Sequence, residues 1–209
     1  MNNKWNAFIY KLWAPFYDQL FDKGPFLRAR KEIFGSLSFR QGDKVLLVGV
    51  GTGADLVHMP DNLDINAIDY SNEMLEKAKS KLPGSGIQFF QMDAQDLKFQ
   101  NETFDWVIGS LILTVVPDGG KALAEMVRVS KRGGLIVIFD KFKPSGRSLS
   151  LLKKMARPII RLLGTDIGVS FEGLAEWVRR DIIIKKNEDI LFNGMYKFIL
   201  LEKERDESK

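Results

Sequence analysis

Three glycines lie directly after an apolar run in the sequence VLLVGVGTG. They are Gly49, Gly51 and Gly53, and the run before them has the composition of a buried strand. Glycine permits positive φ angles and lets a ligand lie against the main chain. A helix that follows such a loop presents unpaired N–H groups to an anionic or polar ligand group. The pattern predicts a ligand-binding loop, although a tight strand-to-helix turn without a ligand gives the same spacing.

A carboxylate follows where a ribose would need one. Asp69 lies twenty residues after Gly49, at the end of the next predicted strand. A carboxylate at that place can accept both hydroxyl hydrogens of a ribose. The letters GVGTGA also satisfy the G-x-G-x-x-G/A nucleotide fingerprint, with Ala54 in the last place. We therefore expect a ribose-bearing cofactor, and these residues leave NAD and S-adenosylmethionine both open.

Two later strand ends add candidate contacts. Asp93 follows a predicted strand, and its carboxylate can accept from the exocyclic amine of an adenine while the Ala94 N–H faces a ring nitrogen. Ser110 lies near the carboxyl end of the following predicted strand. Ligands of parallel sheets bind beyond the carboxyl ends of the strands. The residues are thus expected to line one cleft, and the carboxylate at Asp93 favours S-adenosylmethionine over NAD.

The elements that position these residues alternate between strand and helix. Strands are predicted at 44–50, 63–70, 87–92, 104–113, 135–140, 181–186 and 196–203, and helices at 5–16, 25–37, 71–82, 117–130, 148–163 and 171–180. Ser71 is the expected N-cap of one helix, and the KRGG segment is expected to end another. Such alternation predicts an α/β fold with a doubly wound, mostly parallel sheet.

Composition excludes several classes of protein. The 209 residues are 45% hydrophobic, which is enough for a substantial core in one domain. The chain has no cysteine and one histidine, so thiolate and histidine-rich metal sites are excluded and a cytoplasmic location is expected. The start lacks a secretory pattern, and no apolar run has the length of a membrane-spanning helix.

Charge is concentrated in one segment. The formal net charge is +4, but residues 141–164 hold seven Lys or Arg and no acid, so the remainder carries −3. This argues against a nucleic-acid binder and indicates one local anionic contact. The basic segment reads equally as an interfacial helix on anionic lipid and as a surface helix with its cations in solvent. The aromatic N-terminal helix adds weight to the membrane alternative.

The motifs together resemble those of a known family. VLLVGVGTG, INAIDYSNEMLEKAK, FQMDAQDL, FDWVIGSLILTVVPD and EMVRVSKRGGLIVIFDKF occur in order from about residue 40 to 142. This series resembles the class I S-adenosylmethionine-dependent methyltransferases. Within them, LWAPFYDQLF, GVGTG and VVPD make the chain most similar to soluble bacterial phosphatidylethanolamine N-methyltransferases, and quinone C-methyltransferases share much of the core.

The resemblance implies a seven-stranded sheet whose last strand is antiparallel. It implies that residues 1–40 form a helical lid on a cofactor-binding domain spanning 41–209, which carries a basic helical insertion at 141–180. It also implies cofactor contacts from Tyr17, at the methionine end, and from Tyr70 and Met74, beside the adenosine. Packing on the domain is an equally good reading of Tyr17, and core packing is the alternative for the other two.

Two positions depart from the family pattern. Leu47 stands where the family usually has an Asp or Glu that helps to anchor the amino-acid end of the cofactor. Its presence implies weaker binding, compensation by another group, or lost activity. Near residue 140 the lipid enzymes tend to have a polar pair before the phenylalanine, and this chain reads Asp140–Lys141–Phe142.

The remaining titratable residues do not identify a catalytic group. Asp18, Asp55 and Asp140 are candidate bases, and nothing in their spacing selects one. His58 is the only side chain that titrates near neutrality without a shift, and a partly exposed position at a helix end is its simplest interpretation.

Three functions follow from the residues. The first is a methyltransferase for a small molecule or a lipid headgroup, such as an amine, with contact to an anionic membrane in the lipid version. The second is an NAD-dependent oxidoreductase. The third, which Leu47 motivates, is a protein that binds S-adenosylmethionine with little or no catalysis.

Overall fold

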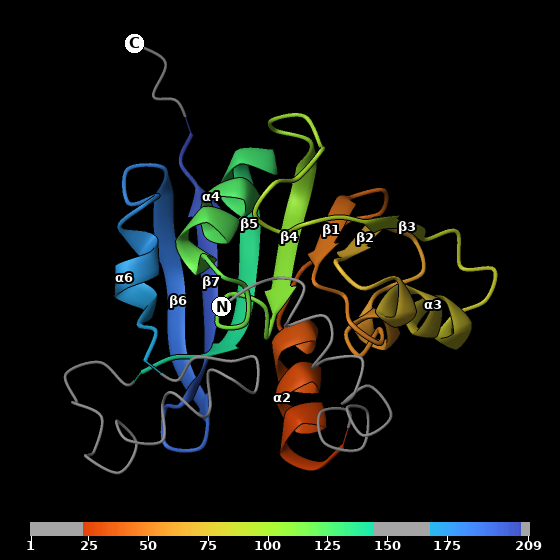
Figure 1. Cartoon of the computed structure of the whole chain (residues 1–209), viewed down its shortest axis with the longest axis horizontal. Coiled ribbons are helices and arrows are strands. Elements are labelled where there is room, and N and C mark those ends of the chain that lie inside the picture. The colour runs from red at the N-terminus through yellow and green to blue at the C-terminus, as the bar shows by residue number, and fades with distance from the viewer. Residues whose placement is uncertain (1–22, 144–167, 206–209) are drawn as a thin grey trace.

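A single seven-stranded sheet organises the part of the chain that the structure describes, residues 23–143 and 168–205 of a computed structural model. The strands are β1 (Lys44–Val48), β2 (Asp64–Asp69), β3 (Gln88–Gln91), β4 (Phe104–Ser110), β5 (Ser130–Lys141), β6 (Ile182–Leu191) and β7 (Tyr196–Lys203). Their order across the sheet is β3-β2-β1-β4-β5-β7-β6 (Figure 1). The first five strands are parallel, and β7 is antiparallel to both neighbours. The predicted doubly wound sheet is confirmed, including its antiparallel last strand.

Helices cover both faces of the sheet. They are α2 (Gly24–Gly35), the short 3-10 helix η1 (Leu56–His58), α3 (Asn72–Lys81), α4 (Gly119–Val129) and α6 (Phe171–Ala175). On one face, Met126 of α4 joins Ile136 and Ile138 of β5 in a buried apolar cluster. On the other, Phe26 of α2 joins Val137 and Phe139. The alternation of β5 between the two clusters explains why its apolar run is continuous.

Several predicted boundaries were wrong for local reasons. The KRGG segment lies inside β5, where Phe104 pairs with Ser130 and Trp106 pairs with Leu135, so residues 131–134 bulge from the ladder. Gly133, with a φ of 71°, supplies the conformation that such a bulge requires. The helix predicted at 117–130 accordingly runs only from Gly119 to Val129.

The C-terminal elements also differ from their predicted lengths. The helix predicted at 171–180 ends at Ala175, and the chain then tightens because the N–H groups of Trp177 and Val178 donate to carbonyls three residues back. Strand β6 extends to Leu191 rather than to 186, and a tight turn joins it to β7. The predicted helices at 5–16 and 148–163 lie outside the described residues, as does most of the expected lid.

The carboxyl ends of β1, β2 and β4 meet at one edge of the sheet, next to α2 (Figure 1). This is the edge at which the sequence places its candidate ligand contacts. The functional site is therefore assembled from the loops that leave these strands.

Candidate functional site

The three glycines of the loop after β1 fall into two groups by what surrounds them. All have positive φ angles, of 71° at Gly49, 56° at Gly51 and 84° at Gly53. A Cβ added at Gly53 would lie 3.2 Å from the Cα of Ala78 in α3, and one at Gly49 would lie 2.6 Å from Cδ1 of Ile112. A Cβ at Gly51 would meet nothing within 4 Å. Gly49 and Gly53 thus allow close packing, whereas Gly51 faces open space.

Asp69 holds this loop from the neighbouring strand. The Gly51 N–H donates to its Oδ2 at 2.8 Å, and the Ser71 N–H donates to its Oδ1 at 2.9 Å. Burial raises the pKa of the Asp69 carboxyl, while the N–H groups of Ser71, Gly51 and Tyr70 act in the opposite direction. Each carboxylate oxygen has accepted one backbone hydrogen bond and keeps capacity for another, which is what two ribose hydroxyls require.

The start of α3 continues this edge. The Ser71 hydroxyl accepts a hydrogen bond from the Met74 N–H at 3.3 Å, as the predicted N-cap does. Tyr70 is 39% exposed beside Asp69, and Met74 is buried in the first turn of α3. Both are thus next to the carboxylate, and their roles toward a cofactor stay predictions.

Asp93 lies one strand further along the same edge. The Met92 N–H donates to the Asp69 carbonyl at 3.0 Å, which brings the two predicted carboxylates together. The Asp93 carboxylate accepts from the backbone N–H of Gln95 at 2.9 Å and from its side-chain amide at 3.0 Å. Ala94, the next residue, is buried. The structure therefore brings Asp69, Asp93 and the glycine loop to one edge, as the sequence predicted.

Gln95 contacts the predicted site residue Asp93, and the sequence did not indicate it. Its side chain is buried, and its Oε1 accepts from the Asp118 N–H at 2.9 Å, so it joins the turn after β3 to the start of α4. A glutamine two residues after an aspartate gives no local signal of burial, because only the folded chain brings Asp118 near.

The carboxyl ends of β4 and β5 hold the predicted Ser110 and a residue that the sequence did not indicate, Thr114. Ser110 is half-buried at the end of β4, opposite Phe139 of β5. Four residues on, the buried Thr114 donates its hydroxyl to Asp140 at 2.8 Å. Asp140 is 0% exposed. A carboxylate with no exposed surface does not contact a methyl acceptor, so the prediction of Asp140 as a candidate base was wrong.

A buried ion pair ties α2 to the end of the glycine loop. Nε of Arg30 lies 2.6 Å from Oδ1 of Asp55, and the two side chains are 3% and 10% exposed. The Arg30 guanidinium also lies over the Phe139 ring, 5.9 Å from its centroid. Asp55 is thereby committed to a cation, which removes it from the candidate bases. Asp18 lies outside the described residues.

Leu47, at which the family resemblance led us to expect an acid, is buried in the core. It is 1% exposed within the same apolar cluster as Phe26, Val45 and Ile108. The position thus contributes apolar packing rather than a polar anchor. His58, at the end of η1, stacks on Phe34 with ring centroids 5.8 Å apart. This supports the simple interpretation of His58 as a helix-end side chain.

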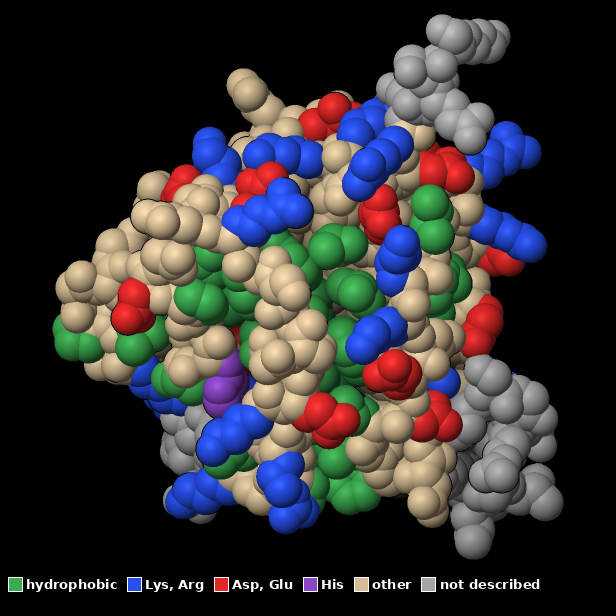
Figure 2. Space-filling view, turned by 180° about the vertical axis from the view of Figure 1, so that it is seen from behind, with side chains coloured by type: hydrophobic (Ala, Val, Ile, Leu, Met, Phe, Trp, Pro, Cys, Tyr) green, Lys and Arg blue, Asp and Glu red, His purple; other side chains and the backbone are tan. Residues whose placement is uncertain are grey.

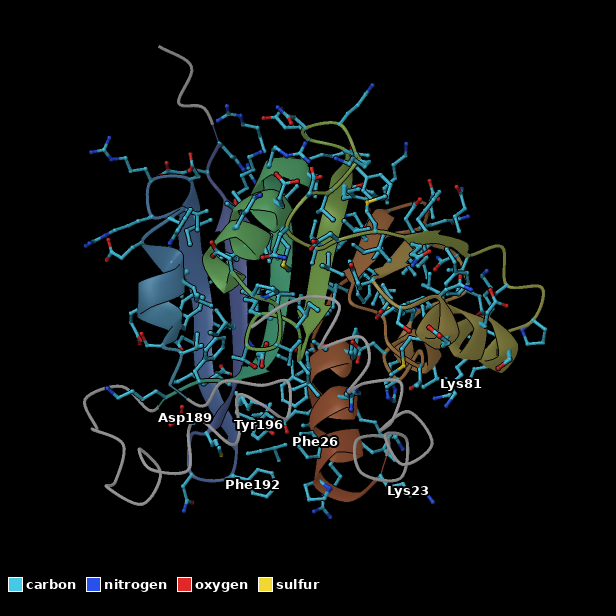
Figure 3. The ribbon with its side chains drawn as sticks, viewed as in Figure 1. Lys23, Phe26, Lys81, Asp189, Phe192 and Tyr196 are labelled. Carbon is cyan, nitrogen blue, oxygen red and sulfur yellow. The ribbon has the colours of Figure 1, made fainter. Side chains whose placement is uncertain are left out.

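Aromatic rings pack at the same edge, between α2 and the β6–β7 turn. The Phe26 and Tyr196 rings meet edge to face with centroids 5.0 Å apart, and the Phe192 and Tyr196 centroids are 5.7 Å apart. Figure 3 labels these three side chains. Burial, and secondarily the charge of Asp140, raises the pKa of Tyr196 to about 12. Its hydroxyl therefore stays protonated over the working pH range.

The described ranges 23–143 and 168–205 contain neither a candidate metal site nor a candidate membrane-spanning helix. No cluster of three or more His, Asp or Glu side chains suited to a metal ion occurs there. Within the same ranges, no helix has the length and apolar character needed to cross a bilayer. Tyr17 lies before these ranges, so its predicted contact stays a prediction.

The strand order and the glycine loop define an α/β fold with a candidate ligand site, and comparison with known proteins shows its class. Residues 46–138 match the family model described as a methyltransferase domain. The chain is 30% identical over 198 residues to the phosphatidylethanolamine N-methyltransferase of Cereibacter sphaeroides, which covers 93% of this chain and 95% of that protein. It is 32% identical to the ubiquinone/menaquinone biosynthesis C-methyltransferase of Francisella philomiragia, over 72% of this chain and 65% of that one.

Solved structures agree with this at the level of the fold. A methyltransferase of Thermotoga maritima, described as a possible histamine N-methyltransferase, superposes with a TM-score of 0.70 at 18% identity. The superposition covers 94% of this chain and 99% of that one. The chain belongs to the class I S-adenosylmethionine-dependent methyltransferases. This favours a methyltransferase over an NAD-dependent oxidoreductase and over a non-catalytic binding protein.

The described residues fit the cofactor that this class uses, S-adenosylmethionine. The open space at Gly51 would be filled by any Cβ, and it lies beside a carboxylate that is held by backbone N–H groups and has free acceptor capacity. Such a cradle suits a ribose lying against the main chain. The site therefore combines an open backbone surface with one strand-end carboxylate, a combination that fits the ribose of this cofactor.

Proposed function

We propose that Gly49, Gly51, Gly53, Asp69, Tyr70, Met74, Asp93, Ala94 and Ser110, together with Tyr17, form the donor site. The support is the convergence of the described members on one sheet edge, together with two hydrogen bonds that fix the Asp69 carboxylate, one from Gly51 in the glycine loop and one from Ser71 at the start of α3. In this assignment Asp69 accepts the ribose hydroxyls and Asp93 accepts from the adenine amine.

The donor site is tested by Asp69→Asn. The amide group must turn its NH₂ toward either the Gly51 or the Ser71 N–H, and it loses the charge that strengthens the ribose hydrogen bonds. We expect S-adenosylhomocysteine to bind roughly 100-fold more weakly by calorimetry, which corresponds to about 3 kcal/mol. Asp64→Asn, an exposed change at the other end of β2, is the matched control. Equal affinity of both variants and the wild type would remove Asp69 from the site.

We propose further that the methyl acceptor is the amine of a phosphatidylethanolamine headgroup. The observation that carries this is the similarity to the Cereibacter sphaeroides enzyme, which extends over 93% of the chain rather than over the cofactor half alone. The aromatic cluster of Phe26, Phe192 and Tyr196 supports this proposal. The cluster provides an apolar surface and the neutral Tyr196 hydroxyl at the sheet edge where the donor site is proposed.

The chemistry asks the protein for positioning. S-adenosylmethionine supplies an electrophilic methyl group, and the protein has to align the acceptor with it and exclude water. Alignment of this kind can contribute roughly 7–11 kcal/mol to lowering the barrier. The amine must be unprotonated to react. Among the candidate bases in the described residues, Asp140 is buried and hydrogen-bonded and Asp55 is paired with Arg30. We therefore propose solvent as the proton acceptor, with Asp18, outside the described residues, as the alternative.

A membrane version of the proposal places the enzyme in the cytoplasm, in peripheral contact with anionic lipid. Its support is the charge of residues 141–164, with seven Lys or Arg and no acid. Co-sedimentation with phosphatidylglycerol vesicles at low salt is expected to exceed that with phosphatidylcholine vesicles and to fall as salt is added. Equal binding to both vesicle types would contradict the contact.

The acceptor is tested with methyl-labelled S-adenosylmethionine. Vesicles containing phosphatidylethanolamine should take up label as the monomethyl lipid, and vesicles of phosphatidylcholine alone should not. The rate should rise with pH, because more of the amine is unprotonated. The similarity to the quinone enzyme motivates a second candidate, so a demethylated menaquinol is assayed in parallel. Label in the quinol alone would replace the amine assignment with carbon methylation.

A further inference from the structure

The carboxylate of Asp140 is completely buried, and the chemistry described above does not use it. It is 0% exposed at the carboxyl end of β5. The Thr114 hydroxyl and the Lys141 N–H donate to its Oδ1 at 2.8 and 2.7 Å, and the Thr114 N–H donates to its Oδ2 at 3.2 Å. Two of these three bonds come from one residue in the turn after β4. Asp140 and Thr114 thus form a two-point clamp, which we call the Asp140–Thr114 clamp.

The turn that the clamp holds is strained at its first residue. Leu111 has a φ of 56° although it is not glycine, and its N–H donates to the Phe139 carbonyl at 2.7 Å. A non-glycine residue in this region costs free energy and persists only where the surroundings enforce it. The Phe139 carbonyl and the clamp enforce it from the same strand, β5. Residues 111–116 are therefore fixed against β5 at the edge where ligands of parallel sheets bind.

Between these two anchors, Ile112 reaches the glycine loop. Its Cδ1 lies 2.6 Å from the place that a Cβ on Gly49 would take, and its Cγ2 lies 3.0 Å from the corresponding place at Gly109. Two residues beyond Gly49, the space at Gly51 is open. Ile112 therefore borders the donor pocket on the β4 side, and its position follows from the turn.

We propose that Asp140 and Thr114 are positioning residues for the donor pocket, and that they act by holding Ile112 against Gly49. Neither touches the cofactor in this assignment. Removing the clamp lets the strained turn relax, so that Ile112 leaves the pocket wall and the cofactor loses a fixed surface on that side. The proposal uses the donor site but does not depend on which acceptor is methylated.

The test compares two threonines at opposite ends of β4. Thr114→Val removes the hydroxyl bond to Asp140, and Thr103→Val removes a hydroxyl bond of the same length, 2.8 Å, to the Gln100 carbonyl. Each protein is titrated with S-adenosylhomocysteine by calorimetry at a temperature well below its melting point. We expect Thr114→Val to bind roughly tenfold more weakly, and Thr103→Val to bind like the wild type. Thr114→Ser keeps the hydroxyl and should restore the affinity.

A purely structural role would give a different result. In that case Thr114→Val would lower the melting temperature and leave the affinity of the folded protein within twofold of the wild type, which would overturn the proposal. If Thr114→Val does not fold, Ile112→Ala tests the same wall: weaker binding supports the proposal, and unchanged binding overturns it. A wild type that does not bind S-adenosylhomocysteine would refute the donor site itself, a failure distinct from loss in the variants alone.

Discussion

The loop after β1 and the turn after β4 lie side by side at one edge of the sheet, but they are built in opposite ways. The loop has positive φ angles at three glycines, and it contacts Asp69 through a backbone group, the Gly51 N–H. The turn has its positive φ at Leu111, which is not a glycine, and it is held by the buried Asp140–Thr114 clamp. The loop leaves space for a ligand, whereas the turn fills space with Ile112. The β1 side of the proposed pocket is therefore shaped by glycines, which have no side chain, and the β4 side by the fixed side chain of Ile112.

The largest effect is expected where the loop itself depends on side chains. Arg30→Met leaves the buried Asp55 carboxylate without its cation, and breaking a buried pair in this way costs about 3–5 kcal/mol. We expect this loss in the free energy of unfolding, measured by denaturant titration. Arg28→Met, an exposed change on the same helix, should stay within about 0.5 kcal/mol of the wild type.

If Arg30→Met proves as stable as the Arg28 control, the loop is held by its backbone alone and the contrast with the turn becomes sharper. A large loss would show instead that the contrast holds only at the pocket surface. In that case both segments rest on buried polar anchors beneath it.

The sequence predicted the loop far better than the turn, and the reason is physical. Gly49, Gly51, Gly53 and Asp69 act through backbone geometry and a fixed offset between consecutive strands, both of which are visible in the chain as written. Thr114 and Asp140 are twenty-six residues apart. Their pairing depends on the β4–β5 register and on the bulge at residues 131–134, which read as a helix end in the sequence.

The fold shows the same division. The five parallel strands and the capped start of α3 were predicted from periodicity and the N-cap at Ser71. The extent of β6 was not, because the polar Asn187, Glu188 and Asp189 were read as part of the connection to the last strand. They are tolerated on an exposed edge strand, where Lys197 of β7 pairs with Asp189 at 2.7 Å.

A smaller effect is expected from the clamp. In Asp140→Asn the amide NH₂ must face either the Thr114 or the Lys141 N–H, so one buried donor loses its acceptor. This should lower the free energy of unfolding by about 1–3 kcal/mol. Denaturant titration measures it, with the exposed Asp64→Asn as the control. A loss no larger than that of the control would mean that the turn does not need its side-chain anchor.

The pH dependence of that loss has a defined sign. Burial raises the pKa of the Asp140 carboxyl above its ordinary value of 3.8. A group whose folded pKa is raised contributes stability that is fully present below pH 3.8 and is lost as pH rises through the folded pKa. The deficit of Asp140→Asn should therefore be largest in acid and should shrink toward neutral pH. A deficit that grows with pH would contradict the raised pKa.

The smallest effects separate two glycines of the loop itself. Alanine at Gly49 or Gly51 must adopt a left-handed φ, which costs about 1–2 kcal/mol. At Gly49 the new methyl group also meets Ile112 at 2.6 Å, so Gly49→Ala should lose more stability than Gly51→Ala. At Gly51 the methyl group meets no protein atom within 4 Å and enters the proposed pocket, so Gly51→Ala should lose more affinity for S-adenosylhomocysteine. Melting curves and calorimetry on the same two variants measure both orders. If Gly49→Ala were the weaker binder and the more stable protein, the open side of the pocket would lie at Gly49, and the assignment of Ile112 as its wall would be wrong.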